Sequence, residues 1–406
     1  MEQYLADLNR VLSENNRLTT LQVQLTSQPD RVGEGETAFQ RGRVVRSSLF
    51  VEQAAHERAI AGHTAKPIFS SRIKKVISER ILFLPGIHAC ITRPFLSKRR
   101  IPARDGEPRG LVSIVSDLHR RYPVDLICLH SAGSADSAEL LDFAAKNQIP
   151  VVYVHHFSND RLASFSMRTQ IEKMAAVGGV TGVDVPRFAQ RSFDTVADGI
   201  DTDFFQKKNA SLVHRTSQVP LIFLGARITP TKGQADVIRA AGELKRRGIA
   251  FEVAFGGRLD SPGFEKEIQD LILAERVEDR VFLLGQLNST QLRDWYGAAA
   301  VLAFPTRHHE GLPRILLECQ AMGVPPVVFD RGGTSEGIID GQTGYLVEPG
   351  DFKTLVTRLQ TLLEQPELRG QFAVAGRKLV ESKFSLAALA VRHEEFYLRA
   401  LERNRH

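Results

Sequence analysis

Short apolar runs alternate with segments of helical periodicity along most of the chain. In the first half, apolar runs at 125–130, 151–155 and 176–181 are separated by helical segments at 137–146 and 161–174. Strands that alternate with helices of ten or more residues are typical of βαβ units in a parallel sheet. The pattern therefore predicts an α/β fold.

The same alternation fills the second half. It predicts strands at 221–224, 250–255, 281–284, 299–304 and 327–329, and helices at 234–247, 264–274, 290–298, 352–363, 368–380 and 387–403. The polar, aperiodic residues 207–219 between the halves indicate a linker. We therefore predict two doubly wound, Rossmann-like domains, residues 1–206 and 220–406, which face each other across a ligand-binding cleft.

The first 120 residues are less regular. They predict a helix at 4–12, a strand at 20–25, a helix at 49–60, a short strand at 81–84 and a helix at 111–119. Within this part, residues 66–109 hold eleven Lys and Arg against three acidic residues. Two interpretations stay open: a solvated loop face, or a surface that contacts an anionic membrane or a phosphate-bearing acceptor.

Composition and charge exclude several classes of protein. A length of 406 residues exceeds what one core usually serves, and the net charge of +6 is shared evenly by the halves, which argues against nucleic-acid binding. The cysteines, Cys90, Cys128 and Cys319, show no disulfide or metal spacing, and the last two lie in apolar elements as small core residues. No apolar leader or run of 18 apolar residues occurs, so we expect a cytoplasmic protein, at most peripheral to a membrane.

Residues 305–318, PTRHHEGLPRILLE, place Glu310 after a buried strand and Glu318 on the following helix, which we expect to open at Pro313 in its first turn. Eight residues of helix advance about 12 Å and turn about 800°, so both carboxylates can face one groove. The helix N-terminus between them favours a phosphate. This layout suits a nucleotide sugar. The eight-residue spacing alone is weak evidence, because Glu267/Glu275 and Glu394/Glu402, in solvated helical stretches, share it.

A second candidate segment is GARITPTKG at 225–233, directly after the strand 221–224. The guanidinium of Arg227 can fork onto phosphate oxygens, and the ammonium of Lys232 adds a point charge nearby. Together they can neutralise a diphosphate without a metal ion.

In this order, the motifs of the second half resemble the retaining glycosyltransferases of the GT-B fold, family 4, also called group 1. The resemblance covers about 105–385 and is carried by GAR…KG at 225–233, GQL at 285–287, EGLPRILLE at 310–318, VVFDRGGTSE at 327–336 and DGQTGYLV at 340–347. It implies that the last helices pack back on the first domain. It also implies that the chain begins after the family's opening strand and glycine-rich loop, being truncated there or differently built.

The resemblance implies a donor site made of Arg227, Lys232, Gly285, Leu287, Glu310, Gly311, Leu312, Glu318, Gly332 and Gly333. Arg227 and Lys232 would hold the diphosphate. Glu310 would bind the sugar hydroxyls, and Glu318 the ribose. The GQL segment would lie along the nucleobase, and the two glycines at 332–333 would form the loop that closes on the donor.

On the acceptor side, PVVYVHH at 150–156 resembles the family's strand that ends in a histidine, which makes His156 the match. His155 should point to the opposite face, because side chains alternate along a strand. That the two are loop histidines without a catalytic task stays open. His130 is a second acceptor-side candidate. The residues that we expect to act in catalysis are His156, Glu310, Arg227 and Lys232.

The implied activity is the metal-independent transfer, with retention, of a hexosyl group from a UDP- or GDP-sugar to an acceptor hydroxyl. A role in surface polysaccharide, glycolipid or glycoconjugate synthesis follows from the family, and no cofactor is expected. Two alternatives remain: a nucleotide-sugar epimerase on the same frame, and a non-catalytic partner subunit that keeps the donor half.

Four further features bear on this interpretation. Asp201 and Asp203 spell the D-x-D of metal-dependent glycosyltransferases, but the segment resembles the family's structural G-x-D-x-x-x-F. The pair His308-His309 is unsuited to a metal ion, because adjacent residues rarely converge on one. Pro313 stands where many relatives have glycine. Arg314 is either an additional phosphate contact or an exposed helix residue.

Overall fold

The computed structural model describes residues 18–26, 34–39, 42–50, 69–76, 80–84, 101–102, 108–109, 111–121, 124–129, 135–155, 165–182, 193–213, 215, 217–260 and 262–403. The chain divides into two compact units. Unit 1 comprises Met1–Val180, Val185–Val196 and Ala390–His406, and unit 2 comprises Thr181–Asp184 and Ala197–Leu389. The predicted linker 207–219 falls inside unit 2 and contains a single 3-10 turn, η5 (Lys207–Asn209).

Unit 1 is built on a nine-stranded sheet in the order β11-β10-β9-β8-β5-β4-β1-β3-β2. Its strands are β1 (Leu18–Thr26), β2 (Glu34–Phe39), β3 (Gly42–Phe50), β4 (Phe69–Val76), β5 (Arg80–Leu84), β8 (Leu126–Leu129), β9 (Val151–His155), β10 (Ala176–Gly179) and β11 (Phe193–Thr195). The five strands from β5 to β11 are parallel, as the alternation predicted. A separate antiparallel pair joins β6 (Ile101–Pro102) and β7 (Pro108–Arg109).

One sequence prediction in this unit is wrong at its start. The predicted helix at 49–60 begins with Leu49 and Phe50, and both belong to β3. Both residues pair with β1, opposite Leu25 and Thr26, which places them within the sheet. The remainder of that predicted helix lies outside the described residues, as does the predicted helix at 4–12.

The helices of unit 1 include α3 (Leu111–Arg121), α4 (Ala135–Lys146) and α5 (Phe165–Glu172). The last helix, α12 (Leu386–Arg403), crosses from unit 2 into unit 1 and packs against the β10–β11 edge of its sheet. Arg399 pairs with Asp194 at 2.9 Å, and the ring of Phe396 fills the space above Gly178. The C-terminal turns of the chain therefore complete the core of unit 1.

Unit 2 contains a six-stranded parallel sheet in the order β14-β13-β12-β15-β16-β17. The strands are β12 (Leu221–Leu224), β13 (Glu252–Phe255), β14 (Val281–Leu283), β15 (Val301–Phe304), β16 (Pro326–Phe329) and β17 (Tyr345–Val347). The chain starts in the middle, moves out to β14, and returns to the other side of β12. The strand order therefore reverses between β12 and β15, the place where such sheets bind ligands at their carboxyl ends.

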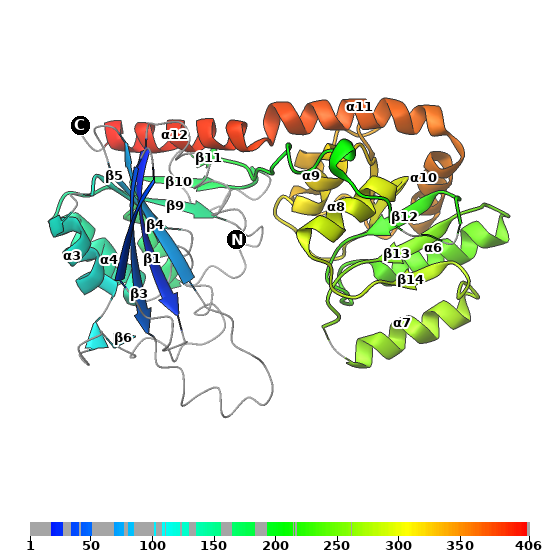
Figure 1. The fold of residues 1–406 in the computed structure, drawn as a ribbon, viewed down its shortest axis with the longest axis horizontal. Helices are drawn as coiled ribbons and strands as arrows, with labels where there is room; N and C mark the ends of the chain where they lie inside the picture. The colour runs from blue at the N-terminus through cyan, green and yellow to red at the C-terminus, as the bar shows by residue number, and fades with distance from the viewer. Residues whose placement is uncertain are drawn as a thin grey trace. The chain divides into compact units, whose positions relative to one another are not determined.

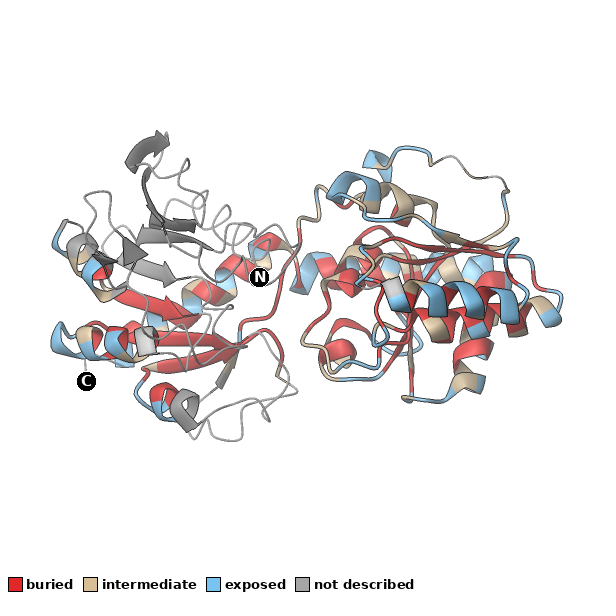
Figure 2. Ribbon diagram, turned by 90° about the horizontal axis from the view of Figure 1, so that it is seen from below, coloured by how far each residue is buried: buried red, intermediate tan, exposed pale blue. Residues whose placement is uncertain are grey.

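Helices flank this sheet on both faces (Figures 1 and 2). They are α6 (Gln234–Arg246), α7 (Pro262–Ala274), α8 (Ser289–Ala298), α9 (Arg314–Ala321), α10 (Phe352–Glu364) and α11 (Pro366–Lys383). All residues of β12, β13, β15 and β16 are buried, and most helices are buried along one side only (Figure 2). Burial on both faces explains why these strands are continuous apolar runs in the sequence.

The buried cysteines are core residues, as predicted. Cys128 and Cys319 are fully buried, and burial raises the pKa of the Cys128 thiol to about 12. Cys90 lies outside the described residues. No helix in the described part of the chain combines the length and apolar character that crossing a bilayer requires.

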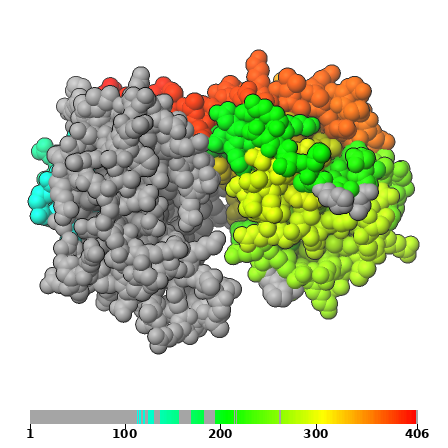
Figure 3. Space-filling view, viewed as in Figure 1, coloured from blue at the N-terminus to red at the C-terminus, as the bar shows by residue number. Residues whose placement is uncertain are grey.

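Residues 197–210 run along the surface of unit 2, of which they are a part, and lie beside α8 and α11 (Figure 3). Arg377 on α11 donates to the carbonyl oxygens of Phe205 and Thr202 in this segment, at 2.5 and 3.0 Å, and to that of Ala321 on α9, at 2.7 Å. One guanidinium on α11 thus contacts both the 202–205 segment and the end of α9.

Candidate functional site

The candidate residues of unit 2 gather at the carboxyl edge of its sheet, beside the reversal of strand order. Arg227 lies just past the end of β12, and Lys232 lies just before α6. Glu310 follows the end of the neighbouring strand β15. Because β12 and β15 are parallel neighbours, both loops leave the sheet at the same edge.

Gly233 brings the two loops into contact. It is the N-cap of α6 with φ +92°, and a Cβ there would lie 2.5 Å from the carbonyl oxygen of Pro305. Only glycine permits both this left-handed backbone and this approach. The next residue, Gln234, is fully buried and donates from Nε2 to the carbonyl oxygen of Arg227 at 2.9 Å, which fixes the course of the 225–233 turn.

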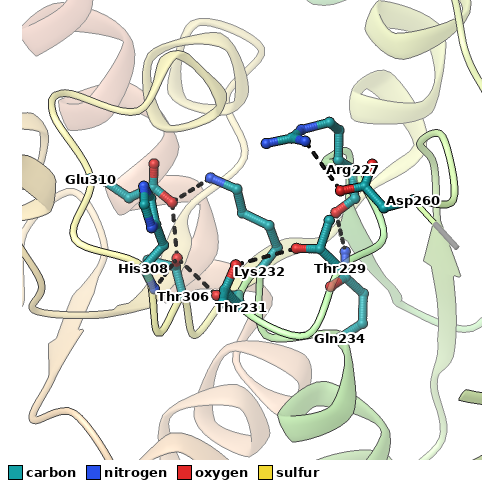
Figure 4. Close-up of polar contacts among 9 residues, drawn as sticks. All are labelled: Arg227, Thr229, Thr231, Lys232, Gln234, Asp260, Thr306, His308 and Glu310. Atoms are coloured by element: carbon teal, nitrogen blue, oxygen red, sulfur yellow. Dashed lines mark hydrogen bonds and ion pairs between the residues drawn. The ribbon is translucent and has the colours of Figure 1, made fainter. Parts of the chain in front are cut away.

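Lys232 and Glu310 form the closest charged pair of the site. Lys232 Nζ lies 2.5 Å from Glu310 Oε1, and the two side chains are only 16% and 12% exposed. The hydroxyl of Thr306 donates to the same oxygen at 2.9 Å. Oε2 of Glu310 accepts no hydrogen bond from the described residues, and it points away from this cluster (Figure 4). The carboxylate is therefore held in place by one oxygen and keeps the other for a ligand.

Arg227 lies on the other side of Lys232 in the close-up (Figure 4). Its Nη1 pairs with Asp260 Oδ2 at 3.2 Å, and its side chain is 59% exposed. A pair as exposed as this one contributes little to stability. Most of the guanidinium fork faces solvent and can meet an anion.

The glycines at 332–333 pack directly on the loop that carries Glu310. The amide of Gly333 donates to the carbonyl oxygen of Glu310 at 2.9 Å. Gly332 has φ +66°, and a Cβ there would lie 2.2 Å from that same oxygen. The backbone of Glu310 is thus positioned by a close contact that no side chain could share.

The predicted helical path from Glu310 to Glu318 is wrong. α9 begins at Arg314, with Pro313 as an extended N-cap residue at ψ 119°, so Pro313 is not in the first helical turn. Half of the separation is therefore non-helical, and Glu318 is only the fifth residue of the helix. Proline is tolerated at this helix start because its missing N–H would have no intrahelical partner there, and its side chain caps no first-turn amide. The carboxylate of Glu318 is 12% exposed and lies 3.8 Å from Arg314 Nε.

Arg314 is not the exposed helix residue that the sequence suggested. Its Nη1 donates to Asp198 Oδ1 at 3.0 Å and to the carbonyl oxygen of Gly199 at 2.9 Å, and its side chain is only 21% exposed. Burial raises the pKa of the Asp198 carboxyl, and the charge of Arg314 opposes that shift. Sequence inspection did not single out Asp198 or Thr306, although Thr306 lies in the 305–318 segment, because the hydrogen bonds of Asp198 with Arg314 and of Thr306 with Glu310 appear only in the fold.

The remaining donor-side residues lie in neighbouring loops of the same unit. Gly285 follows β14 with φ +69°, and its carbonyl oxygen accepts from the amide of Gly257 at 2.8 Å. Leu287 packs over Gly256, where a Cβ would meet its side chain at 2.5 Å. In the loop before α9, Gly311 is half-buried, and the side chain of Leu312 is buried in the core.

The acceptor-side candidates His130 and His156 lie outside the described residues. The neighbouring His155 is described, at the end of β9. It is buried, and its Nδ1 lies 3.1 Å from the hydroxyl of Tyr153.

The D-x-D segment forms a turn. Asp201 Oδ1 accepts hydrogen bonds from the amides of Asp203 and Phe204, at 3.0 and 2.9 Å. In the part of the chain that the structure describes, no three His, Cys, Asp or Glu side chains converge as metal ligands would, and this includes the pair His308-His309.

The chain also resembles known proteins in the part that holds these residues. Residues 206–379, which hold every donor-side candidate, match the family described as Glycosyl transferases group 1. This segment is a group 1 glycosyltransferase domain. The chain aligns over 235 residues, 56% of each chain, at 31% identity to the GDP-mannose-dependent alpha-(1-6)-phosphatidylinositol monomannoside mannosyltransferase of Mycolicibacterium smegmatis. The chain spans about half the length of the curated relatives it matches.

Solved structures extend the likeness beyond the group 1 domain. Sucrose-phosphate synthase from Thermosynechococcus elongatus superposes with a TM-score of 0.65 at 16% identity, over 94% of this chain and 88% of that one. Anabaena Alr3699/HepE in complex with UDP gives 0.60 at 18% identity, over 71% and 82%. At such identities the likeness establishes the fold alone, and the predicted α/β fold of the GT-B class is confirmed.

Proposed function

We propose that this protein is a retaining glycosyltransferase of family 4 that moves a hexosyl group from a UDP- or GDP-sugar to an acceptor hydroxyl without a metal ion. The observation that carries the proposal is the Lys232–Glu310 pair at the carboxyl edge of the group 1 domain, with Arg227 beside it. A relative named as GDP-mannose-dependent and a fold neighbour bound to UDP support a nucleotide-sugar donor.

In this proposal each residue binds a different part of the donor. Arg227 and Lys232 are the cations for the diphosphate, and the amides at the start of α9 add the positive end of a helix dipole, since Pro313 does not cap them. Glu310 Oε2 accepts from the sugar hydroxyls. Glu318, five residues into α9, is assigned to the ribose.

In the retaining scheme that the family resemblance implies, the bond between the anomeric carbon and the diphosphate oxygen breaks. The acceptor oxygen bonds to the same face of that carbon, and its proton passes to the leaving phosphate. Negative charge grows on the leaving group as an oxocarbenium-like centre develops. Preorganised cations stabilise such a charge more in the transition state than in the ground state, so Arg227 and Lys232 would contribute to the rate itself.

The first experiment identifies the donor and then tests the site. A thermal-shift panel of UDP- and GDP-sugars identifies the donor, because a bound ligand stabilises by RT ln(1 + [L]/Kd). Nucleotide release from that donor is then measured with and without EDTA. We expect release to survive EDTA and to fall at least about 100-fold in Arg227→Ala and in Glu310→Ala.

This test has one control and three contrary outcomes. Arg246→Ala removes an arginine that is 60% exposed at the far end of α6, and it should leave the rate unchanged. A strict requirement for a divalent metal would refute the metal-independent scheme. Donor conversion without any acceptor would instead favour an epimerase, and binding without turnover a non-catalytic partner subunit. The acceptor itself, whether lipid-linked, a saccharide or another hydroxyl compound, would be identified with the same assay.

A further inference from the structure

A cavity of about 510 Å³ opens at the carboxyl edge of the unit 2 sheet, where β15, β16 and β17 end beside the first turns of α6 and α10. It is lined by Asp236, Arg239, Thr306, Arg307, Phe329, Arg331, Pro349, Gly350 and Phe352. A volume in this range accommodates a small organic ligand. None of the donor-site residues proposed above belongs to its lining.

The walls of this cavity combine two kinds of surface. Phe329, Pro349 and Phe352 supply apolar area, and Phe329 is itself buried in the core. Three arginines, one aspartate and Thr306 supply the polar part. A ligand that fits such walls carries negative charge on a body with some apolar surface.

The charges within the cavity do not cancel. Asp236 is nearly buried and accepts from Arg307 Nη2 at 2.7 Å and Nε at 2.9 Å, and it pairs more weakly with Arg239 at 3.4 Å. The side chain of Arg331 forms no hydrogen bond or ion pair with any described residue. One carboxylate therefore faces three guanidinium groups. Arg307 and Arg239 are 59% and 45% exposed, so their outer N–H groups remain accessible.

The cavity shares one wall with the donor site. Thr306 lines it, and the Thr306 hydroxyl donates to Glu310 on the other side of the same loop. The adjacent Arg307 lines it as well. An occupant that contacts Arg307 would thus lie next to Thr306, the residue whose hydroxyl holds the Glu310 carboxylate.

We propose that this cavity binds the phosphate group of a small sugar phosphate. Guanidinium forks match phosphate oxygens two at a time, and separate arginines can approach one phosphate from different directions. Phe329, Pro349 and Phe352 lie against the sugar ring. The inference does not depend on the transferase activity proposed above, because it concerns different residues and a different ligand.

Calorimetric titration of the full chain with glucose 6-phosphate tests the proposal. The double variant Arg239→Ala/Arg331→Ala should weaken binding at least about tenfold, because each lost hydrogen bond to a charged group changes affinity by that factor or more. Arg246→Ala, an exposed arginine on the same helix as Arg239 but outside the cavity, should bind as the unmodified protein does. Both replaced arginines are exposed, and unchanged thermal unfolding verifies that the double variant folds.

Two further measurements distinguish this site from the donor site and from a site for phosphate alone. Arg227→Ala/Lys232→Ala removes the cations of the donor site and should leave glucose 6-phosphate binding intact. Loss of binding in that variant, or equal binding in Arg239→Ala/Arg331→Ala, would overturn the proposal, as would the absence of any binding. Inorganic phosphate should bind more weakly than glucose 6-phosphate. Equal affinity would overturn the assignment to a sugar phosphate, since the apolar walls would then contribute nothing.

Discussion

Replacing Gly332 by alanine should test whether activity depends on the position of Glu310, because the substitution moves its loop and leaves its carboxylate unchanged. Gly332 has φ +66° and ψ −132°, and its missing side chain makes room for the backbone of Glu310. A Cβ would lie 2.2 Å from the Glu310 carbonyl oxygen, whereas real contacts of this kind stay above 3.0 Å. The loop must therefore move by about 0.8 Å or more. Gly341→Ala is a matched control, because Gly341 has φ +69° and nothing within 4 Å of its Cβ.

Gly332→Ala and Gly341→Ala share one free-energy cost, that of the backbone conformation, and differ in a second, that of steric overlap. A backbone with positive φ costs a non-glycine residue about 1–3 kcal/mol, which applies to both. Steric overpacking adds about 1–3 kcal/mol at Gly332 alone. For a domain of this size each kcal/mol lowers Tm by about 2–4 °C, so Gly332→Ala should melt several degrees below Gly341→Ala. A misplacement near 1 Å in an active site costs about 100-fold in rate.

The assay is nucleotide release from the identified donor, measured where both variants are folded. We expect Gly341→Ala to stay within about twofold of the unmodified protein and Gly332→Ala to lose about 100-fold. If Gly332→Ala releases nucleotide within threefold of its control, the close contact does not position Glu310, and the argument fails. A Tm equal to that of the control would show that the loop relaxes without strain.

Three other predictions concern stability, thiol chemistry and surface charge. Arg377→Ala should lower the free energy of unfolding by about 2–4 kcal/mol in denaturant titrations, because three carbonyl oxygens lose a charged donor, whereas the exposed Lys378→Ala should stay within about 0.5 kcal/mol; equal effects would contradict this. With a pKa of about 12, Cys128 is roughly one part in ten thousand thiolate at pH 8, so peptide mapping should find it unmodified by iodoacetamide in the folded protein and modified in denaturant; alkylation should rise with pH toward that value, and rapid labelling of the native chain at pH 8 would refute the burial argument. If the basic residues of 66–109 contact a membrane, sedimentation should show binding to anionic liposomes that weakens with salt, and equal, negligible binding to anionic and neutral liposomes would leave only the solvated-face interpretation.

Most of the unit 2 fold could be predicted from hydrophobic pattern because its strands are buried on both faces. Such strands appear as continuous apolar runs, and β12 was located to the residue. β17 was missed: it has only three residues, Tyr345–Val347, and follows a turn rather than a helix. Length alone is not the reason, because β14 also has three residues and was predicted; unlike β17, it follows a helix of clear periodicity. β11 of unit 1, also three residues long, was not predicted either.

The candidate site was predicted as a set of residues but not as a set of contacts. Motif order placed Arg227, Lys232 and Glu310 at one sheet edge, since parallel strands end together. Which side chains pair across that edge depends on loop paths that local sequence does not determine. Lys232 and Glu310 are 78 residues apart in the sequence, and Arg314 and its partner Asp198 are 116 residues apart. The error at α9 has a different origin, because the helix starts at Arg314, one residue after the proline, and this changes the geometry assumed for Glu318.

One ammonium group joins the two parts of the proposed donor site. Lys232 offers three N–H donors in a flexible arrangement, and Glu310 Oε1 is the hydrogen-bond acceptor found for it among the described residues. The remaining donors can turn to a phosphate without releasing the carboxylate. A guanidinium at this position would present a planar fork suited to one bidentate acceptor rather than to two acceptors on different sides. In the proposed function this difference would suit the order of the cations in GARITPTKG: Arg227 would bind a single anion at the exposed rim, while Lys232 would contact the Glu310 carboxylate and a phosphate at once.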